Sequence, residues 1–312
     1  MPLPIEAYAL IGDTRTAALV GNDGSIDWLC LPRFDSQACF AALLGEPRHG
    51  RWLLAPSDPV QCTRRRYREA TLILETEFET PTGVVRVTDC MPLGKNHYCH
   101  VLRVVEGLAG EIAMRMELII RFDYGSVVPW VQRSGQKLIA TAGPDTLELR
   151  TPARMHGEDM MTHAEFVVRQ GERVPFVLSY RASHLRASPG IAAEAALEAT
   201  EKWWRGWSAR CTYTGPWREP VLRSLITLMA LTYQSTGGIV AAPTTSLPEQ
   251  LGGVRNWDYR YCWLRDANFT LVALLYAGYR DEAKAWRAWL LRAVAGRPSS
   301  STTARRIWTR AC

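Results

Sequence analysis

The sequence predicts an antiparallel β domain, then one linking helix, then a helical region. Three observations lead to this fold class: apolar and polar residues alternate early in the chain, the pattern changes near Ser188-Pro189-Gly190, and helical spacing follows. With 312 residues, of which 47% are hydrophobic, the chain is long enough for two domains. We therefore expect four parts: a β domain (1–187), a linker helix (188–216), a region of further helices (217–296) and a tail (297–312).

The β assignment depends on apolar residues that recur with a period of two. In EIAMRMELIIR the alternate positions from Ile112 to Ile120 are apolar, and RVPFVLSY repeats this pattern from Val174 to Tyr180. The segment TLILETEFETPTGVVRVTDC (71–90) predicts two strands joined by a Pro-Thr-Gly turn. Many short strands separated by turns are typical of an antiparallel sandwich.

Four segments predict helices. The first is IAAEAALEATEKWWRGW (191–207), in which one helix face carries Ala193, Leu197, Thr200, Trp204 and Trp207. The second is WREPVLRSLITLMALTYQ (217–234), whose apolar face carries Val221, Leu222, Leu225, Leu228 and Met229. FTLVALLYAG (269–278) predicts a helix that ends at Gly278, and DEAKAWRAWLLRAVAG (281–296) predicts a helix capped by Asp281 and ended by Gly296.

The charge distribution argues against nucleic-acid binding. The net charge is +6, but the tail (297–312) contributes +4 of it and the other 296 residues carry only +2. A basic pI that comes from a tail is poor evidence for such binding, so we predict no nucleic-acid partner. No apolar run reaches the roughly 18–20 residues of a membrane helix, and the N-terminus lacks a secretory signal pattern. We therefore expect a cytoplasmic protein without a membrane partner, and the sequence does not define its oligomeric state.

The eight cysteines include no Cys-x-x-Cys pair, and we expect reduced thiols. Cys90, His97, Cys99 and His100 are close in sequence, but their spacing matches no zinc pattern, so we favour strand positions for them. We predict neither a metal nor a cofactor.

Tryptophan is concentrated in the second part of the chain, since nine of the twelve lie beyond residue 200. They could fill a large core, where each indole N–H needs a partner. They could also line a sugar site, because flat rings stack on the apolar faces of pyranoses. Composition alone favours the core.

The segment NWDYRYCWLRDAN (256–268) gathers four aromatic residues around an Arg-Asp pair. It ends a long loop that starts at Gly237 between two predicted helices, and long loops often carry function. Arg265 can donate a fork of N–H groups and Asp266 can accept hydrogen bonds. With Tyr259 and Trp263 nearby, the pair would suit a sugar. On these residues alone, a cap for a helix that starts near Ala267 is an equally good interpretation.

The same segment resembles the first signature of glycoside hydrolase family 15, the glucoamylase, glucodextranase and bacterial trehalase-like group. That signature, Asp-Tyr-x-Tyr-x-Trp-x-Arg-Asp, is filled at every fixed position by residues 258–266. The segments IEAYALIGDTRTAALVGNDGSIDWLCLPRFDS and GGIVAAPTTSLPEQLGG also look like bacterial members, so the resemblance covers about residues 4–296. It implies an N-terminal antiparallel β-supersandwich, a linker helix, and the start of an (α/α)6 barrel that is incomplete in this chain.

The resemblance also implies roles for the Arg-Asp pair and its neighbours. Arg265 and Asp266 would bind the hydroxyls of the sugar at the non-reducing end, and Tyr259 and Trp263 would line the same subsite. This favours a binding pair over a helix cap. Family members are inverting glycosidases whose two catalytic Glu residues lie on later barrel segments, so we assign no catalytic residue in this chain. The acids Glu249, Asp27 and Asp35 receive no catalytic role.

The function implied by the resemblance is hydrolysis of an α-glucosidic bond, with inversion, in a small glucan or in trehalose. The tail RPSSSTTARRIWTRAC (297–312) resembles no family segment, and we favour a frameshift as its origin over a natural short tail that docks or stays disordered. We therefore expect a truncated and inactive N-terminal part. The alternative is a non-catalytic carbohydrate-binding or assembly module.

Overall fold

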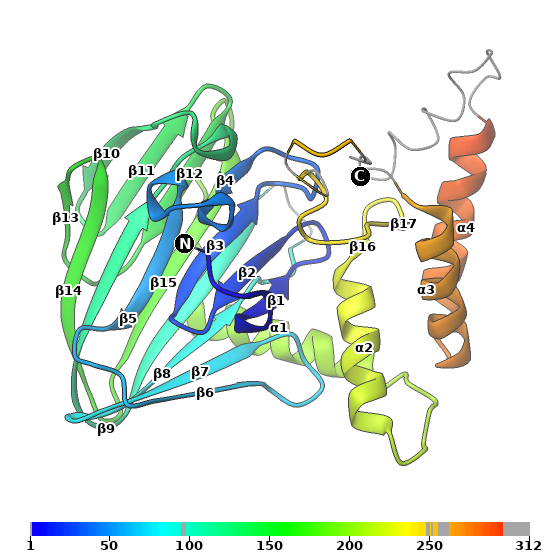
Figure 1. The fold of residues 1–312 in the computed structure, drawn as a ribbon, viewed down its shortest axis with the longest axis horizontal. Helices are drawn as coiled ribbons and strands as arrows, with labels where there is room; N and C mark the ends of the chain where they lie inside the picture. Colours follow the sequence, from blue (N-terminus) through cyan, green and yellow to red (C-terminus); the bar gives the residue numbers. More distant parts are fainter. Residues whose placement is uncertain (1, 95–97, 248–249, 251, 255–261, 296–312) are drawn as a thin grey trace.

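The fold was obtained as a computed structural model, which describes residues 2–94, 98–247, 250, 252–254 and 262–295. Figure 1 shows a β domain on one side and the helices α2, α3 and α4 on the other, with α1 running from the β domain toward α2. The predicted order of β domain, linking helix and further helices is therefore confirmed.

The β domain is built around one long strand, β9 (Cys99–Ile119), of 21 residues. Its first half pairs with β8 (Gly83–Cys90) and β15 (Arg173–Ala182), and its second half pairs with β5 (Arg51–Pro56) and β14 (Met161–Arg169). All four pairings are antiparallel. Because each half of β9 pairs with different strands, β9 belongs to two sheets.

The change of sheet falls at two glycines of β9. A Cβ at Gly107 would lie 2.2 Å from the carbonyl oxygen of Arg169, and Gly110 has a φ of +72°. A side chain at position 107 would clash with this carbonyl, and residues with a side chain rarely adopt a φ such as that of Gly110. Glycine is therefore favoured at both positions. The predicted strand around Ile112–Ile120 is therefore the second half of a longer strand.

The remaining strands extend each sheet outward. The sheet at the second half of β9 adds β1 (Tyr8–Gly12), β2 (Ala17–Gly21), β3 (Ser25–Cys30), β4 (Ala38–Phe40) and β13 (Met155–Glu158). The other sheet adds β6 (Cys62–Tyr67), β7 (Leu74–Thr80), β10 (Trp130–Ser134), β11 (Lys137–Ala142) and β12 (Asp145–Arg150). The predicted hairpin in 71–90 is confirmed as β7 and β8. Short 3-10 helices occur at Ile5–Ala7, Ala42–Leu44, Pro47–His49 and Asp123–Gly125.

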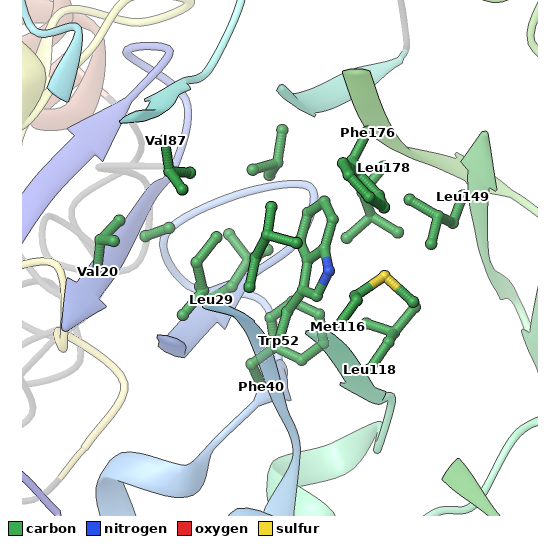
Figure 2. Close-up of a cluster of buried hydrophobic side chains, with 14 of the residues drawn as sticks. Val20, Leu29, Phe40, Trp52, Val87, Met116, Leu118, Leu149, Phe176 and Leu178 are labelled. Carbon is green, nitrogen blue, oxygen red and sulfur yellow. The ribbon is translucent and has the colours of Figure 1, made fainter. Parts of the chain in front are cut away.

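The main core lies between the two sheets. Figure 2 shows Val20, Leu29, Trp52, Met116 and Leu118 from one sheet close to side chains of the other, which are Val87, Leu149, Phe176 and Leu178. Each large apolar side chain buried in this way contributes roughly 1.5–3 kcal/mol to stability. The sandwich predicted from the period-two segments is confirmed.

The linking helix α1 (Ala193–Ser208) covers the outer face of the second sheet. Leu197 packs with Leu102, Val104 and Val177 of β9 and β15. Leu197, Thr200, Trp204 and Trp207 are buried, which confirms the predicted apolar face. Trp204 and Trp207 continue into a second core with α2 and Leu72 of the β domain.

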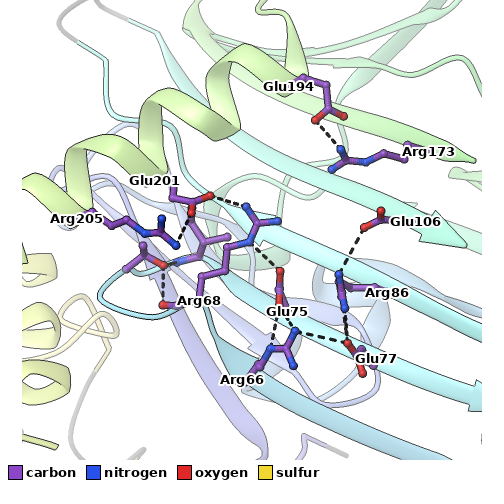
Figure 3. A network of polar contacts seen from close by, with 12 residues as sticks. Arg66, Arg68, Glu75, Glu77, Arg86, Glu106, Arg173, Glu194, Glu201 and Arg205 are labelled. Atoms are coloured by element: carbon purple, nitrogen blue, oxygen red, sulfur yellow. Dashed lines mark hydrogen bonds and ion pairs between the residues drawn. The ribbon is translucent and has the colours of Figure 1, made fainter. Parts of the chain in front are cut away.

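Ion pairs also join α1 to this sheet (Figure 3). The Arg68 guanidinium donates to Glu75 and to Glu201 of α1, at 2.7 Å in each case. Arg173 of β15 pairs with Glu194 at 2.9 Å. Burial would raise the pKa of Glu75, but hydrogen bonds from Arg68 and Arg66 outweigh it, so the pKa is lowered. This carboxylate is therefore held in its charged form.

The helices after α1 differ from the predictions at their ends. Helix α2 (Arg218–Ala230) ends four residues before Gln234, because Thr232–Tyr233 (β16) pairs with Gly238–Ile239 (β17). Helix α4 (Arg280–Ala295) starts one residue before Asp281, so Asp281 lies in the first turn and is not the cap. No described helix has both the length and the apolar character needed to cross a membrane.

Helix α3 (Leu264–Tyr276) ends as predicted at Gly278, which has a φ of +93°. The Gly278 N–H donates to the Leu275 carbonyl and the Tyr279 N–H to the Leu274 carbonyl, a Schellman motif. A Cβ at Gly278 would lie 2.7 Å from Thr212 Cγ2. This tight turn leads directly into α4.

Candidate functional site

The predicted site residues lie at the start of α3. Trp263 is the N-cap, with an extended backbone, and its carbonyl accepts the first helical hydrogen bond from the Ala267 N–H at 2.9 Å. The helix thus starts at Leu264, three residues earlier than predicted. Arg265 and Asp266 lie inside the first turn and Trp263 is the N-cap, so the alternative interpretation, that the pair caps the helix, is wrong.

The Arg265–Asp266 pair is accessible to solvent. The Arg265 side chain is 70% exposed and that of Asp266 is 37% exposed, and their nearest N and O atoms are 3.3 Å apart. The Arg265 guanidinium lies 6.0 Å from the centroid of the Trp263 ring. An exposed pair of this kind adds only about 0–1 kcal/mol to stability. Its N–H groups and carboxylate can therefore exchange their contact for a ligand at little cost.

Tyr259, the fourth predicted site residue, lies outside the described residues, and so does Glu249. The structure thus brings together Trp263, Arg265 and Asp266 and leaves the position of Tyr259 as a prediction.

A small apolar cluster holds the start of α3 in place. Cys262 is buried with Ile239, Ala267, Leu271 and Trp289, which belong to β17, α3 and α4. Burial raises the pKa of the Cys262 thiol, which keeps it neutral. The backbone just before the Arg-Asp pair is therefore anchored while the pair itself faces solvent.

The chain segment that leads toward the site is hydrogen-bonded to the β domain. The indole N–H of Trp28, on β3, donates to the Pro243 carbonyl at 2.9 Å. The Gln234 N–H donates to the Thr14 carbonyl at 2.9 Å, and the Thr14 hydroxyl donates to the Gln234 side chain at 3.1 Å. No local sequence pattern predicts these contacts, because they join residues more than 200 positions apart.

The other acidic and metal-type residues have structural partners. Asp27 accepts a hydrogen bond from the Tyr8 hydroxyl at 2.7 Å, and burial raises its pKa. Asp35 pairs with Arg33. Cys90, Cys99 and His100 lie in strands, and His97 is outside the described residues. Within the described ranges, no group of three or more His, Cys, Asp or Glu is placed to hold a metal.

Comparisons with known proteins agree with this arrangement. Residues 1–204 match the family model "Trehalase-like, N-terminal", and residues 215–305 match "Glycosyl hydrolases family 15". The second match extends past residue 296 into the segment that we predicted to lie outside the family.

Among similar curated proteins, the trehalase of Mycolicibacterium smegmatis is 36% identical over 309 residues, which are 90% of this chain and 46% of that protein. The trehalase of Thermoplasma volcanium is 34% identical over 286 residues, 89% of this chain and 46% of that protein. Trehalase 1 of Sulfolobus acidocaldarius is 30% identical over 288 residues, 90% of this chain and 47% of that protein. This chain thus spans somewhat less than half the length of these relatives.

A solved structure shows the same fold at low identity. A protein described as a kojibiose phosphorylase from the human microbiome superimposes with a TM-score of 0.51 and 10% identity, over 95% of this chain and 47% of that one. This likeness shows a shared fold, in which a large antiparallel β domain precedes a helical region. By its match over residues 1–204, this chain belongs to the trehalase-like N-terminal family, and residues 215–305 match part of glycosyl hydrolase family 15.

Proposed function

We propose that this chain supplies the β domain and the first sugar-binding elements of an inverting glycosidase that acts on trehalose. The observation that carries the proposal is the Arg265–Asp266 pair, which is exposed in the first turn of α3 beside Trp263. The similar curated proteins named above are all called trehalases, which favours trehalose over a glucan.

The chemistry of the pair fits a sugar with free hydroxyls. The guanidinium donates to hydroxyl oxygens, the carboxylate accepts from hydroxyl protons, and the Trp263 ring offers a flat apolar surface. Tyr259 would add a second ring to the same subsite.

Inversion requires two carboxyl groups about 6.5–9.5 Å apart, one to protonate the leaving oxygen and one to activate water. Asp266 is placed to bind hydroxyls, and the family resemblance assigns the catalytic pair to later barrel segments. We therefore propose that the 312-residue chain binds trehalose without hydrolysing it.

Calorimetric titration of the 312-residue chain with trehalose and with maltose tests this proposal. We expect trehalose to bind, and we expect Asp266→Asn and Arg265→Met each to weaken binding about tenfold or more, because each removes a charge-assisted hydrogen bond. Arg265→Lys keeps the positive charge but loses the forked N–H groups of the guanidinium. This variant should therefore bind trehalose more tightly than Arg265→Met and more weakly than the wild type.

Arg218→Met and Glu219→Gln are matched controls, since these residues are an exposed Arg and Glu that are adjacent in the first turn of α2. Equal losses in the control and test variants would contradict the proposed subsite. Preferential binding of maltose would assign the site to a glucan, and release of glucose from trehalose would show that the chain is active.

A further inference from the structure

A hollow of ≈ 750 Å3 lies between α1, the end of α2 and the first turn of α4. Helices α3 and α4 form a hairpin joined by the turn at Gly278 (Figure 1). The first turn of α4 is therefore at the opposite end of this hairpin from Arg265 and Asp266. The hollow is lined by Lys202, Trp203, Trp207, Gln234, Asp281 and Glu282, among others.

Glu282 lines this hollow, and one of its carboxylate oxygens has no hydrogen-bond partner among the described residues. The Glu282 side chain is only 9% exposed, and its Oε1 accepts hydrogen bonds from the Trp207 indole at 2.8 Å and from the Arg210 guanidinium. Its Oε2 is buried and makes no hydrogen bond with any described residue. A buried carboxylate oxygen without a partner is unfavourable, so the position calls for a donor from a ligand or from water.

Two Trp rings give the hollow an apolar wall. The Trp207 ring stacks on Tyr279 with a centroid distance of 4.1 Å, so one of its faces is already covered. Trp203 is half-buried, contacts Trp204 edge-on at 4.9 Å, and lines the hollow. Trp203 is therefore the ring on which a flat ligand can lie.

The hollow has charges of both signs, which favours an uncharged ligand over a strongly charged one. An anion would meet the free oxygen of Glu282, and Asp281 lies beside it. A cation would meet Lys202 and Arg210. An uncharged ligand that has hydroxyl groups and an apolar face satisfies both sets of groups, and these are the properties of a sugar.

We propose that this hollow is a second saccharide site, separate from the Arg265–Asp266 subsite and without a catalytic role. In it, a hydroxyl of a mono- or disaccharide donates to Glu282 Oε2, and the apolar face of the sugar ring lies on Trp203.

The test uses the 312-residue chain carrying Arg265→Met and Asp266→Asn, so that the first subsite is removed. Saturation-transfer difference NMR and tryptophan fluorescence would be recorded with glucose, trehalose and maltose. We expect at least one of these sugars still to bind. Trp203→Leu and Glu282→Gln added to this background should each weaken that binding about tenfold.

Two controls separate this site from a general loss of structure. Trp217→Leu removes an exposed Trp outside the hollow, and Glu198→Gln removes an exposed acid of α1 that does not line it. Both should leave binding unchanged. If Glu282→Gln unfolds the chain, which circular dichroism would show, Trp203→Leu still decides the question, because only ring contacts are lost there.

Absence of saccharide binding in the double-variant background would overturn the proposal and assign the free Glu282 oxygen to water. Unchanged binding in Trp203→Leu would overturn it as well. If the Arg265–Asp266 subsite does not bind sugar, the wild-type chain and the chain with Arg265→Met and Asp266→Asn should bind sugar equally. That result would contradict the proposed function without contradicting the site at Glu282.

Discussion

Trp28 of the β domain donates a hydrogen bond of 2.9 Å from its indole N–H to the carbonyl oxygen of Pro243. Trp28 is fully buried on β3, and Pro243 lies in the loop that leads toward the Arg265–Asp266 pair. The position of this loop therefore depends on a side chain of the β domain.

The first prediction compares Trp28 with Trp52, another fully buried Trp of the β domain. Trp28→Phe removes the bond to the carbonyl of Pro243, a half-buried residue, and leaves that carbonyl without this donor. Trp52→Phe removes an indole N–H that has no hydrogen-bond partner among the described residues. We expect Trp28→Phe to lower the free energy of unfolding by about 1–2 kcal/mol more than Trp52→Phe. Urea unfolding measures the difference, and an equal or larger cost for Trp52→Phe would contradict it.

The same contact shows what the sequence could and could not predict. Period-two segments identified the second half of β9, where one face is buried and the other is more exposed, and β15, whose centre (176–180) is buried on both faces. The first half of β9 shows no such period, because the core covers one face and α1 covers the other, and all residues from Cys99 to Val105 are buried. Trp28 and Pro243 are 215 positions apart, and no local pattern relates them.

The sequence predicted the candidate site only in part, again because some of its contacts join segments that are far apart in the sequence. The signature located Arg265 and Asp266, but the apolar helical period begins only at Phe269, so the helix start was placed too late. Cys262 anchors the true start through contacts with β17 and α4, which are tertiary and leave no sign in the local sequence. Glu282 was missed because its importance comes from the contact with Trp207, on a different helix.

The second prediction concerns the ion pairs between α1 and the sheet (Figure 3). Glu201 pairs with Arg68 at 2.7 Å, and both side chains are largely shielded from solvent. Glu194 pairs with Arg173 at 2.9 Å but is more exposed. Because solvent screens exposed pairs, we expect Glu201→Gln to cost about 1 kcal/mol of stability and Glu194→Gln to cost less. Thermal unfolding at low and high salt checks this, and a larger cost for Glu194→Gln would count against it.

The third prediction is a dependence of stability on pH through His100. Burial lowers the pKa of His100 from 6.5 to about 4, and the charges of Arg15 and Arg150 add to this effect. Between these two pH values the unfolded chain binds a proton that the folded chain does not, so stability falls as the pH falls from about 6.5 to about 4. The full loss amounts to about 3 kcal/mol, and it is complete below the folded pKa.

His100→Gln should remove most of this slope, while the amide can still bond to the Ser179 hydroxyl, which now lies 2.8 Å from His100 Nδ1. Free energies of unfolding by urea, measured for both proteins across this pH range, provide the comparison. His163, which lies in β14 and is less buried, supplies the matched control His163→Gln. Parallel pH curves for wild type and His100→Gln would exclude His100 as the cause.

The last prediction concerns the buried pair Arg103–Asp89, in which neither side chain is exposed. Arg103 Nε donates to Asp89 at 2.7 Å, and the same guanidinium donates to the carbonyls of Trp52 and Gly24. Arg103→Met would leave a buried carboxylate and two carbonyls without their donor, and we expect it to lower the free energy of unfolding by about 3–5 kcal/mol.

Two comparisons make the Arg103 prediction specific. Adding Asp89→Leu to Arg103→Met should recover part of the loss, because the unpaired buried charge is then gone. Arg51→Met breaks the pair with Glu117, whose side chains are 20% and 24% exposed, and should cost no more than about 1 kcal/mol. Urea unfolding of the four proteins measures each value. A cost for Arg103→Met as small as that for Arg51→Met would mean that water or a shift of the backbone replaces the guanidinium, and that its bonds to the Trp52 and Gly24 carbonyls do not hold the two sheets together.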